Sequence, residues 1–292
     1  MIGGYLATTS WSTGPKTARG VRMEERVAAD PLDADAWVAL LAEASEQGAS
    51  DYRPLFERCV SHFPSAACVW YQWLEAELRG RQLEAMEGIF ERCLLSCPHV
   101  ELWRLYLRYL RQEKRVPNKE LQGAYELLLE AVGMDVAAGT LWVEYVALLC
   151  ESVEPGMMPM SGPVTTARDA YQRALVQPAT GLEAMWKDYE TWEAVQSGPN
   201  AKSLLADIAD KVLVARRVAR ERSALSATLK LNRMPRVPRG TVGEFAELAN
   251  WRAMWTYEAG NPRARATPPA TRPRPAAPCC QPAMRNATRA LP

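Results

Sequence analysis

One tryptophan after another in this chain begins the same short pattern, in which a large apolar or aromatic residue follows three positions later. Because residues i and i+3 share one face of an α-helix, each tryptophan marks a helix with a wide apolar face. Six of the ten tryptophans show this pattern: Trp37, Trp70, Trp103, Trp142, Trp186 and Trp251. These six are 33, 33, 39, 44 and 65 residues apart, and the shorter of these intervals are typical of helical-repeat proteins.

A second shared segment, centred on an aromatic residue, lies between consecutive tryptophans. It reads FERC at 56–59 and again at 90–93, YELL at 125–128 and YQRA at 171–174. A proline follows three of these segments, where it can end a helix without removing an interior hydrogen bond. These prolines are Pro64, Pro98 and Pro178. Each unit is therefore predicted to be a tryptophan helix, a turn and a second helix.

The repeated helix pairs predict the fold class. A single pair cannot bury both of its faces, so adjacent pairs must stack on one another. Strand signals are nearly absent, since there is little period-2 alternation. We predict an all-α fold, a right-handed α-solenoid of TPR-like helix pairs, whose aromatic residues form the core rather than a surface for stacking nucleic-acid bases. The predicted repeat core contains Trp37, Phe56, Trp70, Phe90, Trp103, Tyr125, Trp142, Tyr171, Trp186 and Trp251.

The repeat region is expected to extend over residues 22–262. Residues 1–21, rich in Gly, Ser and Thr, are expected to be a disordered leader. Residues 200–230 contain no Gly or Pro and predict one long helix, and residues 244–258 predict the start of a further repeat. Residues 263–292 are rich in Arg, Pro and Ala and cannot bury enough apolar surface to offset their ordering entropy. We expect a disordered tail there.

The composition, with 48% hydrophobic and 24% charged residues, is typical of a soluble globular protein. No run of 18 apolar residues could form a transmembrane helix, and the first residues lack the basic and apolar regions of a secretory signal. Seven cysteines, an odd number in a large chain, favour a reducing compartment over a disulfide framework. We expect no membrane association.

Charge is distributed unevenly along the chain. Residues 1–210 contain 19 Lys and Arg against 30 Asp and Glu, whereas residues 211–292 contain 16 against 4. Such polarity suggests that the C-terminal part meets an acidic partner. A basic set on the predicted long helix is either a solvated face or a docking surface for an acidic protein or RNA phosphates. It contains Lys211, Arg216, Arg217, Arg220 and Arg222.

Residues that could carry chemistry are few. Nucleotide-binding loops and the usual metalloprotease and serine-hydrolase motifs are absent. The two histidines, His62 and His99, lie beside helix-ending prolines, where a general base is hard to place. Cys59 and Cys93 occupy the position that Ala174 holds in YQRA, so we predict that they are packing residues. We expect no catalytic site, no metal site and no cofactor.

Charged residues on the repeat helices are expected to be solvated or to pair between repeats. The adjacent pairs Glu57-Arg58 and Glu91-Arg92 are interpreted as structural salt links or exposed charges. The same interpretation applies to Glu75, Glu77, Glu190 and Glu193.

The first and second helices resemble the half-a-TPR (HAT) repeat. In order, DPLDADAWVALLAEA, FPSAACVWYQWLEAE, IFERCLLSCPHVELWRLYLRY, ELLLEAVGMDVAAGTLWVEYV, ARDAYQRALVQP, LEAMWKDYETWE and VARRVARE are similar to the N-terminal half of the suppressor-of-forked family. That family provides the large scaffold subunit of the cleavage stimulation factor. The resemblance, over roughly residues 22–262, implies a non-enzymatic nuclear scaffold of pre-mRNA 3′-end processing whose partners are subunits of that machinery.

The chain also departs from the family pattern. In the family, homodimerisation is carried by a second HAT region. The resemblance covers only the N-terminal half of the family and so does not imply a homodimer here. Residues 263–292 resemble no part of the family and are interpreted as a truncated or mispredicted end. Two other functions stay open: a HAT scaffold of a splicing complex, and a TPR-like adaptor that binds peptides. The irregular 39-, 44- and 65-residue intervals argue against the adaptor.

Overall fold

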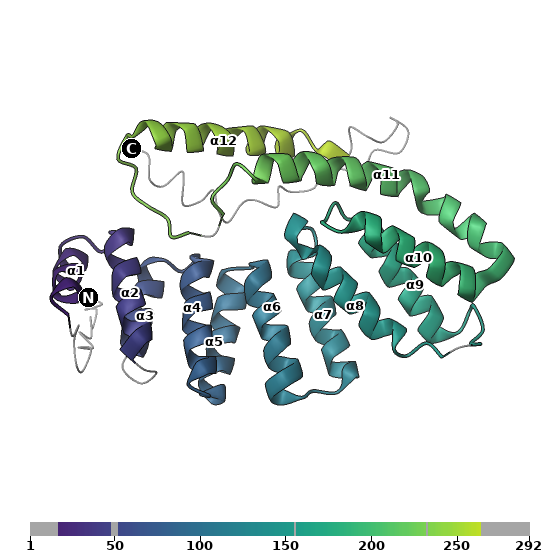
Figure 1. The fold of residues 1–292 in the computed structure, drawn as a ribbon, viewed down its shortest axis with the longest axis horizontal. Helices are drawn as coiled ribbons and strands as arrows, with labels where there is room; N and C mark the ends of the chain where they lie inside the picture. Colours follow the sequence, from purple (N-terminus) through teal and green to yellow (C-terminus); the bar gives the residue numbers. More distant parts are fainter. Residues whose placement is uncertain (1–16, 48–51, 155, 232, 264–292) are drawn as a thin grey trace, which may run out of the picture. The chain divides into compact units, whose positions relative to one another are not determined.

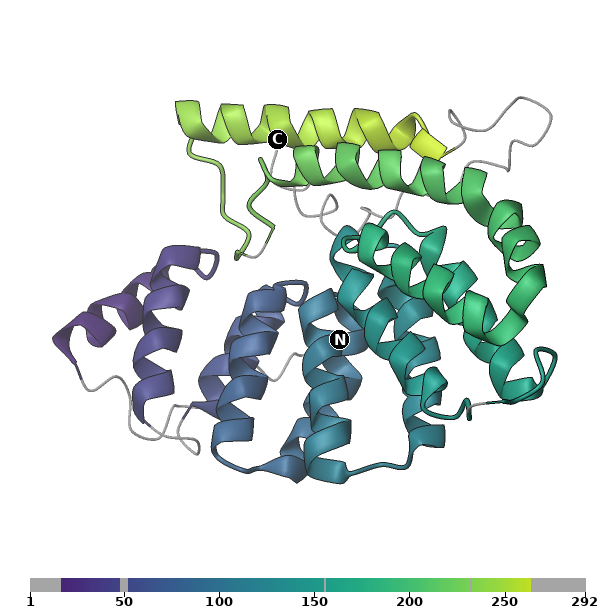
Figure 2. The same cartoon turned by 45° about the vertical axis from the view of Figure 1, so that its right-hand side comes forward.

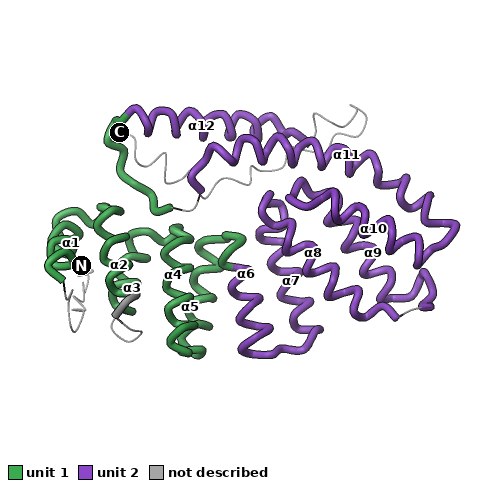
Figure 3. The backbone as a smooth tube through the Cα atoms, in the orientation of Figure 1, with its two compact units in different colours: residues 1–102, 232–241, 282–292 green, residues 103–231, 242–281 purple. Residues whose placement is uncertain are grey.

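The computed structural model describes residues 17–47, 52–154, 156–231 and 233–263. These residues form α-helices joined by turns and contain no strand, in agreement with the all-α prediction. The chain divides into two compact units (Figure 3). Unit 1 contains residues 1–102, 232–241 and 282–292, and unit 2 contains residues 103–231 and 242–281.

The N-terminal part of unit 1 is a series of helices in which each helix packs on the next (Figure 1). Their bounds are α1 Ala18–Ala29, α2 Ala34–Gln47, α3 Arg53–His62, α4 Ala67–Arg79 and α5 Leu83–Ser96. Pro54 lies in the first turn of α3, where its missing N–H has no helical partner to lose. The helices α3 and α5 end shortly before Pro64 and Pro98, as the sequence predicts.

The start of α1 corrects the predicted leader. Ala18–Gly20 and the residues after them are helical, although the leader was expected to reach residue 21. Thr17 caps the helix, since its Oγ1 accepts a hydrogen bond from the Gly20 N–H at 2.9 Å, and such a cap stabilises a helix by about 1 kcal/mol. Thr17 also donates through Oγ1 to Glu43 at 2.6 Å. The rest of the predicted leader and residues 264–292 lie outside the described residues.

Unit 2 continues the helix series, and Figure 2 shows its later helices from a second angle. The helix α6, Val100–Tyr109, begins before the unit boundary at residue 103 and ends in a π-helical turn at Leu110–Lys114. The remaining helices are α7 Asn118–Val132, α8 Gly139–Cys150, α9 Gly162–Leu175, α10 Leu182–Ser197, α11 Ala201–Ser226 and α12 Val242–Ala259. Each helix from α7 to α12 packs on the next. The long helix predicted at 200–230 is α11, and the one predicted at 244–258 lies within α12.

The core is built where the aromatic residue of a second helix meets the residue three positions after the next tryptophan. These ring pairs have centroids 5.2–5.8 Å apart, close enough for aromatic stacking. They are Phe56 with Trp73, Tyr125 with Tyr145, and Tyr171 with Tyr189. The i, i+3 pattern in the sequence therefore corresponds to contacts between consecutive helices.

Eight of the ten predicted core aromatics are buried in the described structure: Trp37, Phe56, Trp70, Phe90, Trp103, Tyr125, Trp142 and Tyr171. Trp186 and Trp251 are only half-buried, and here the core prediction was too broad. The guanidinium carbon of Arg216, on α11, lies 5.6 Å from the ring centre of Trp186. Trp251 lies on α12, none of whose residues is buried. The right-handed sense of the solenoid stays a prediction.

Candidate partner-binding surfaces

An arginine from the second helix of a pair covers the tryptophan of the first helix. The guanidinium carbons of Arg58 and Arg92 lie 5.4 Å from the ring centres of Trp37 and Trp70. In unit 2, Arg173 lies 5.6 Å from the ring centre of Trp142. A cation this close to an aromatic face is attracted to it by about 0.5–1 kcal/mol at exposed sites.

The same arginines form ion pairs with glutamates one repeat earlier. Arg92 binds Glu57 at 2.7 Å, Arg58 binds Glu24 at 2.6 Å, and Arg173 binds Glu126 at 2.8 Å. Glu57 and Arg58 are therefore not partners of each other, as adjacent residues in FERC, but links to the repeats on either side. We call these tryptophan, arginine and glutamate contacts the Arg-Trp ladder.

Two glutamates on first helices are fully buried, although solvation was one of the two states expected for them. Glu77 accepts two hydrogen bonds from Arg53, both at 2.7 Å, and one from the Trp73 indole at 3.0 Å. Glu193 is held by Arg168 at 2.8 and 2.9 Å. Each glutamate lies seven residues after a repeat tryptophan, and each arginine three residues before the aromatic of a second helix. That spacing is a sequence signal for the buried pairs.

The buried carboxylate of Glu193 stays ionised because of its partners. Burial raises its pKa, but hydrogen bonds from Arg168, Ser197 and Tyr189 outweigh burial, so the pKa lies below the ordinary 4.5. A charge fully removed from water is tolerated only when it is paired and hydrogen-bonded. The pair of Arg168 and Glu193 therefore links α9 to α10.

The thiols of the second helices are shielded from solvent. Cys59 and Cys93 are fully buried. Burial raises the pKa of each thiol to about 12, and that of Cys97 to about 11. Because the thiolate is the reactive form, this environment is that of packing residues. Among the described residues, no group of three His, Cys, Asp or Glu side chains is placed to hold a metal ion.

The predicted basic set of α11 does not form one surface. Arg216 turns toward α10, where it binds Glu183 at 3.0 Å and lies 5.6 Å from the ring centre of Trp186. Arg222 is buried and binds Glu258 of α12 at 2.6 and 2.7 Å. The prediction that the basic set forms one solvated face or docking surface is therefore wrong for Arg216, which pairs with Glu183 of α10 and is largely covered.

The other basic residues of α11 are exposed but point in different directions. Lys211 and Arg220 are nine residues apart, which at about 100° per residue places them on opposite sides of the helix. Arg217 and Arg220, three residues apart, share an exposed face. Glu221 lies 3.9 Å from Arg217 and reduces the positive charge there. The remaining candidate surface is thus the pair Arg217 and Arg220.

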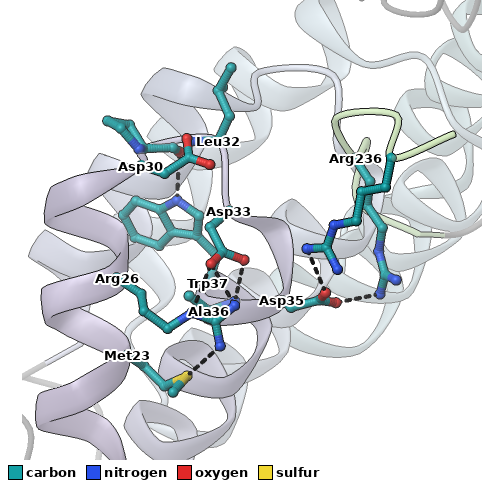
Figure 4. Close-up of polar contacts among 11 residues, drawn as sticks. Met23, Arg26, Asp30, Leu32, Asp33, Asp35, Ala36, Trp37 and Arg236 are labelled. Atoms are coloured by element: carbon teal, nitrogen blue, oxygen red, sulfur yellow. Dashed lines mark hydrogen bonds and ion pairs between the residues drawn. The ribbon is translucent and has the colours of Figure 1, made fainter.

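An extended connector in unit 1 forms a second candidate surface (Figure 4). Residues 233–241 are not helical, and α12 begins at Val242. Arg236 and Arg239 bind the two carboxylate oxygens of Asp35, on the first turn of α2, at 2.7 and 3.5 Å. Met234 is only 3% exposed. The sequence showed only a polar, proline-containing connector here, and no local pattern relates Asp35 to arginines 201 and 204 residues later.

Some large apolar residues of α12 are also exposed in the described structure. Val242, Phe245 and Trp255 present large apolar side chains to solvent. None of the described helices combines the length and apolarity needed to cross a membrane.

The sequence is similar to one family profile and to several known proteins. The family profile "Suppressor of forked protein (Suf)" matches residues 18–276. Protein suppressor of forked from Drosophila melanogaster is 32% identical over 248 residues, which cover 84% of this chain and 32% of the fly protein. Cleavage stimulation factor subunit 77 from Arabidopsis thaliana is 32% identical over 77% of this chain and 31% of its own length. The mRNA 3′-end-processing protein rna14 of Schizosaccharomyces pombe is 29% identical over 72% of this chain and 29% of its own.

The profile match, over residues 18–276, extends beyond both ends of the resemblance at residues 22–262. A crystal structure of CstF-77 aligns with 65% of this chain and 42% of its own, at 18% identity and a TM-score of 0.49. The chain spans about a third of the length of the curated relatives it matches. Because the family profile matches residues 18–276, which include the whole repeat region, the chain belongs to the suppressor-of-forked family.

Proposed function

We propose that this chain is a non-enzymatic scaffold of the nuclear machinery that cleaves and polyadenylates pre-mRNA 3′ ends. The observation that carries the proposal is the family match over residues 18–276. Its support comes from relatives named as a cleavage stimulation factor subunit and as mRNA 3′-end-processing proteins. Because the chain spans only about a third of those relatives, their role is extended to it as a proposal.

The helical architecture fits this role. Each pair of a repeat protein contacts only its neighbours, so an array offers a large surface for its length. In each unit the Arg-Trp ladder joins successive pairs and fixes the surface that partners would meet. The partners in the proposal are protein subunits of the cleavage and polyadenylation machinery.

A weak RNA contact belongs to the same proposal. Arg217 and Arg220 form an exposed basic pair on α11. Contacts of this kind with phosphates give affinity without reading the base sequence and weaken as salt rises. With Glu221 close by, the pair would supplement protein contacts rather than replace them.

Affinity purification of the tagged chain from nuclear extract, followed by mass spectrometry, tests the proposal. The expected result is enrichment of cleavage and polyadenylation subunits over a tagged Trp70→Ala control, whose second repeat loses a core aromatic. Enrichment of splicing factors would instead favour a spliceosomal scaffold. Equal recovery with both baits, or recovery of neither class, would contradict the proposal.

A further inference from the structure

The connector between α11 and α12 is chemically unlike the helices that flank it. Residues 233–240 contain three arginines, two prolines and one methionine, and no acidic residue. Proline lacks a backbone donor and favours extended conformations, so such a segment cannot bind through helix packing. Its ion pairs with α2 are made by side chains.

Two arginines of the connector make this contact, and the methionine that precedes them, Met234, is buried. Arg233, which precedes Met234, and Arg236, which follows Pro235, are exposed. Arg236 binds one oxygen of Asp35 and Arg239 binds the other. A buried apolar side chain followed by charged side chains that bind an acidic residue is compatible with recognition of an extended peptide on a folded surface.

Asp35 is the acidic residue of the DPLDAD stretch that is directed to this contact (Figure 4). Asp30 accepts a hydrogen bond from the Leu32 N–H at 3.0 Å. Asp33 binds Arg26 at 2.6 Å and accepts from the Ala36 N–H at 3.2 Å. Both of these carboxylates therefore stabilise the α1–α2 turn itself, whereas Asp35 binds residues more than 200 positions away.

The contact is also of a kind that can exchange. All three charged groups are partly exposed, with Asp35 at 38%, and ion pairs at such positions are individually weak. A chemically similar segment could replace the connector without breaking any helix. We propose that the α2 surface around Asp35 is a docking site for an extended, arginine- and proline-containing peptide of a partner protein, which the connector occupies in cis.

A fluorescent peptide with the sequence of residues 233–241, RMPRVPRGT, tests this proposal by anisotropy on the full chain. In Arg236→Glu/Arg239→Glu the connector should leave the site, and the peptide should bind at least about tenfold more tightly than to the wild type. The wild-type site is weakened because a tethered competitor is present at an effective concentration of order millimolar. Adding Asp35→Lys to the released variant should remove the binding.

The matched control is Arg217→Glu/Arg220→Glu, which changes the net charge equally but leaves the connector in place. It should bind the peptide as weakly as the wild type. If Arg236→Glu/Arg239→Glu unfolds, Arg236→Gln/Arg239→Gln removes the same contacts without reversing the charge. Failure of the folded released variant to bind peptide at about 1 mM, near the effective concentration of the tether, would show that the connector is only structural. Binding that persists after Asp35→Lys would overturn the assignment of the site.

Discussion

Glu193 illustrates how a single residue can be both costly and necessary. Its side chain is fully buried, and Arg168, itself only 11% exposed, supplies the compensating charge. A buried pair of this kind is weak evidence for net stability, but removing one partner leaves an uncompensated charge. The same reasoning applies to Glu77, whose carboxylate has Arg53 and the Trp73 indole as partners.

We therefore expect Glu193→Gln to destabilise unit 2 strongly. Loss of one partner of a buried ion pair typically costs about 3–5 kcal/mol, here because Arg168 loses its counter-charge. Urea unfolding measures the effect. Glu190→Gln, on an exposed position of the same helix, is the control and should change stability by less than about 0.5 kcal/mol. Equal effects of the two substitutions would contradict the buried pairing.

The pKa of Glu193 also predicts a pH dependence. It is lower in the folded chain than the ordinary 4.5, so the native state stabilises the ionised form. The contribution is fully present above about pH 4.5, near the unfolded value, and is lost as the pH falls through the folded value. Urea midpoints between pH 3 and 7 should fall less steeply on acidification in Glu193→Gln than in the wild type. Parallel curves would count against this linkage.

Cys59 and Cys93 should tolerate replacement by alanine. Each substitution removes one buried sulfur and should cost about 1 kcal/mol, at the small end of core truncations. With pKa values of about 12, neither thiol should react with a disulfide reagent in the native state at pH 8. Reaction before unfolding, or loss of folding in either variant, would be inconsistent with a packing role.

At the scale of the helix, the sequence predicted which segments are helical but not how they face each other. The sequence predicted α11 from its lack of Gly and Pro and α12 from a further repeat tryptophan. It could not show that Arg216 turns inward while Arg217 stays exposed, because that depends on Glu183 of a neighbouring helix. Helical periodicity constrains the face that a residue occupies, and only packing decides what covers the face.

The repeat containing α6 and α7 departs from the Arg-Trp ladder. Leu127 of YELL stands where FERC and YQRA have arginine, and it is 63% exposed. Trp103, the tryptophan of this repeat, is buried, and its indole N–H has no hydrogen-bond partner in the described part of the chain. Trp37 and Trp70 instead donate to the carbonyls of Pro31 and Pro64, six residues earlier, at 2.9 and 2.8 Å. Before Trp103 the corresponding proline is only five residues away.

Leu127→Arg should restore the missing contact. A guanidinium over the Trp103 ring should stabilise the chain by about 0.5–1 kcal/mol, the range of exposed cation–π pairs. Thermal unfolding would show an increase in Tm relative to the wild type. Leu95→Arg, another exposed leucine, removes the same amount of surface leucine without a tryptophan to cover. If both variants shift equally, the gain does not come from the ladder.

At the scale of the whole chain, the fold decides which charged side chains remain available for partners. Residues 211–292 contain 16 Lys and Arg against 4 Asp and Glu, yet Arg216 and Arg222 form interhelical ion pairs. Net charge could be counted from the sequence, but which cations reach solvent depended on the packing of α10, α11 and α12. The same holds for Arg236 and Arg239, whose acidic partner lies near the start of the chain.

Arg217→Glu/Arg220→Glu should therefore weaken binding to single-stranded RNA. The loss should be largest at low salt, because each phosphate contact releases counterions and steepens the salt dependence. Filter binding between 50 and 200 mM salt, spanning a range over which such contacts are typically lost, measures it. Lys187→Glu/Lys211→Glu also reverses two exposed charges and is expected to have the smaller effect. Equal effects would indicate general electrostatics rather than this pair.

The pairing of Asp35 with the connector also has a consequence for synthesis. The helices α1 and α2 leave the ribosome early, but Arg236 is made 201 residues after Asp35. At a translation rate of 5–20 residues per second, the acidic surface stays without its cis partner for roughly 10–40 s. During that interval a nascent chain would present Asp35 to any basic peptide nearby, because the arginines that bind it in cis have not yet been made.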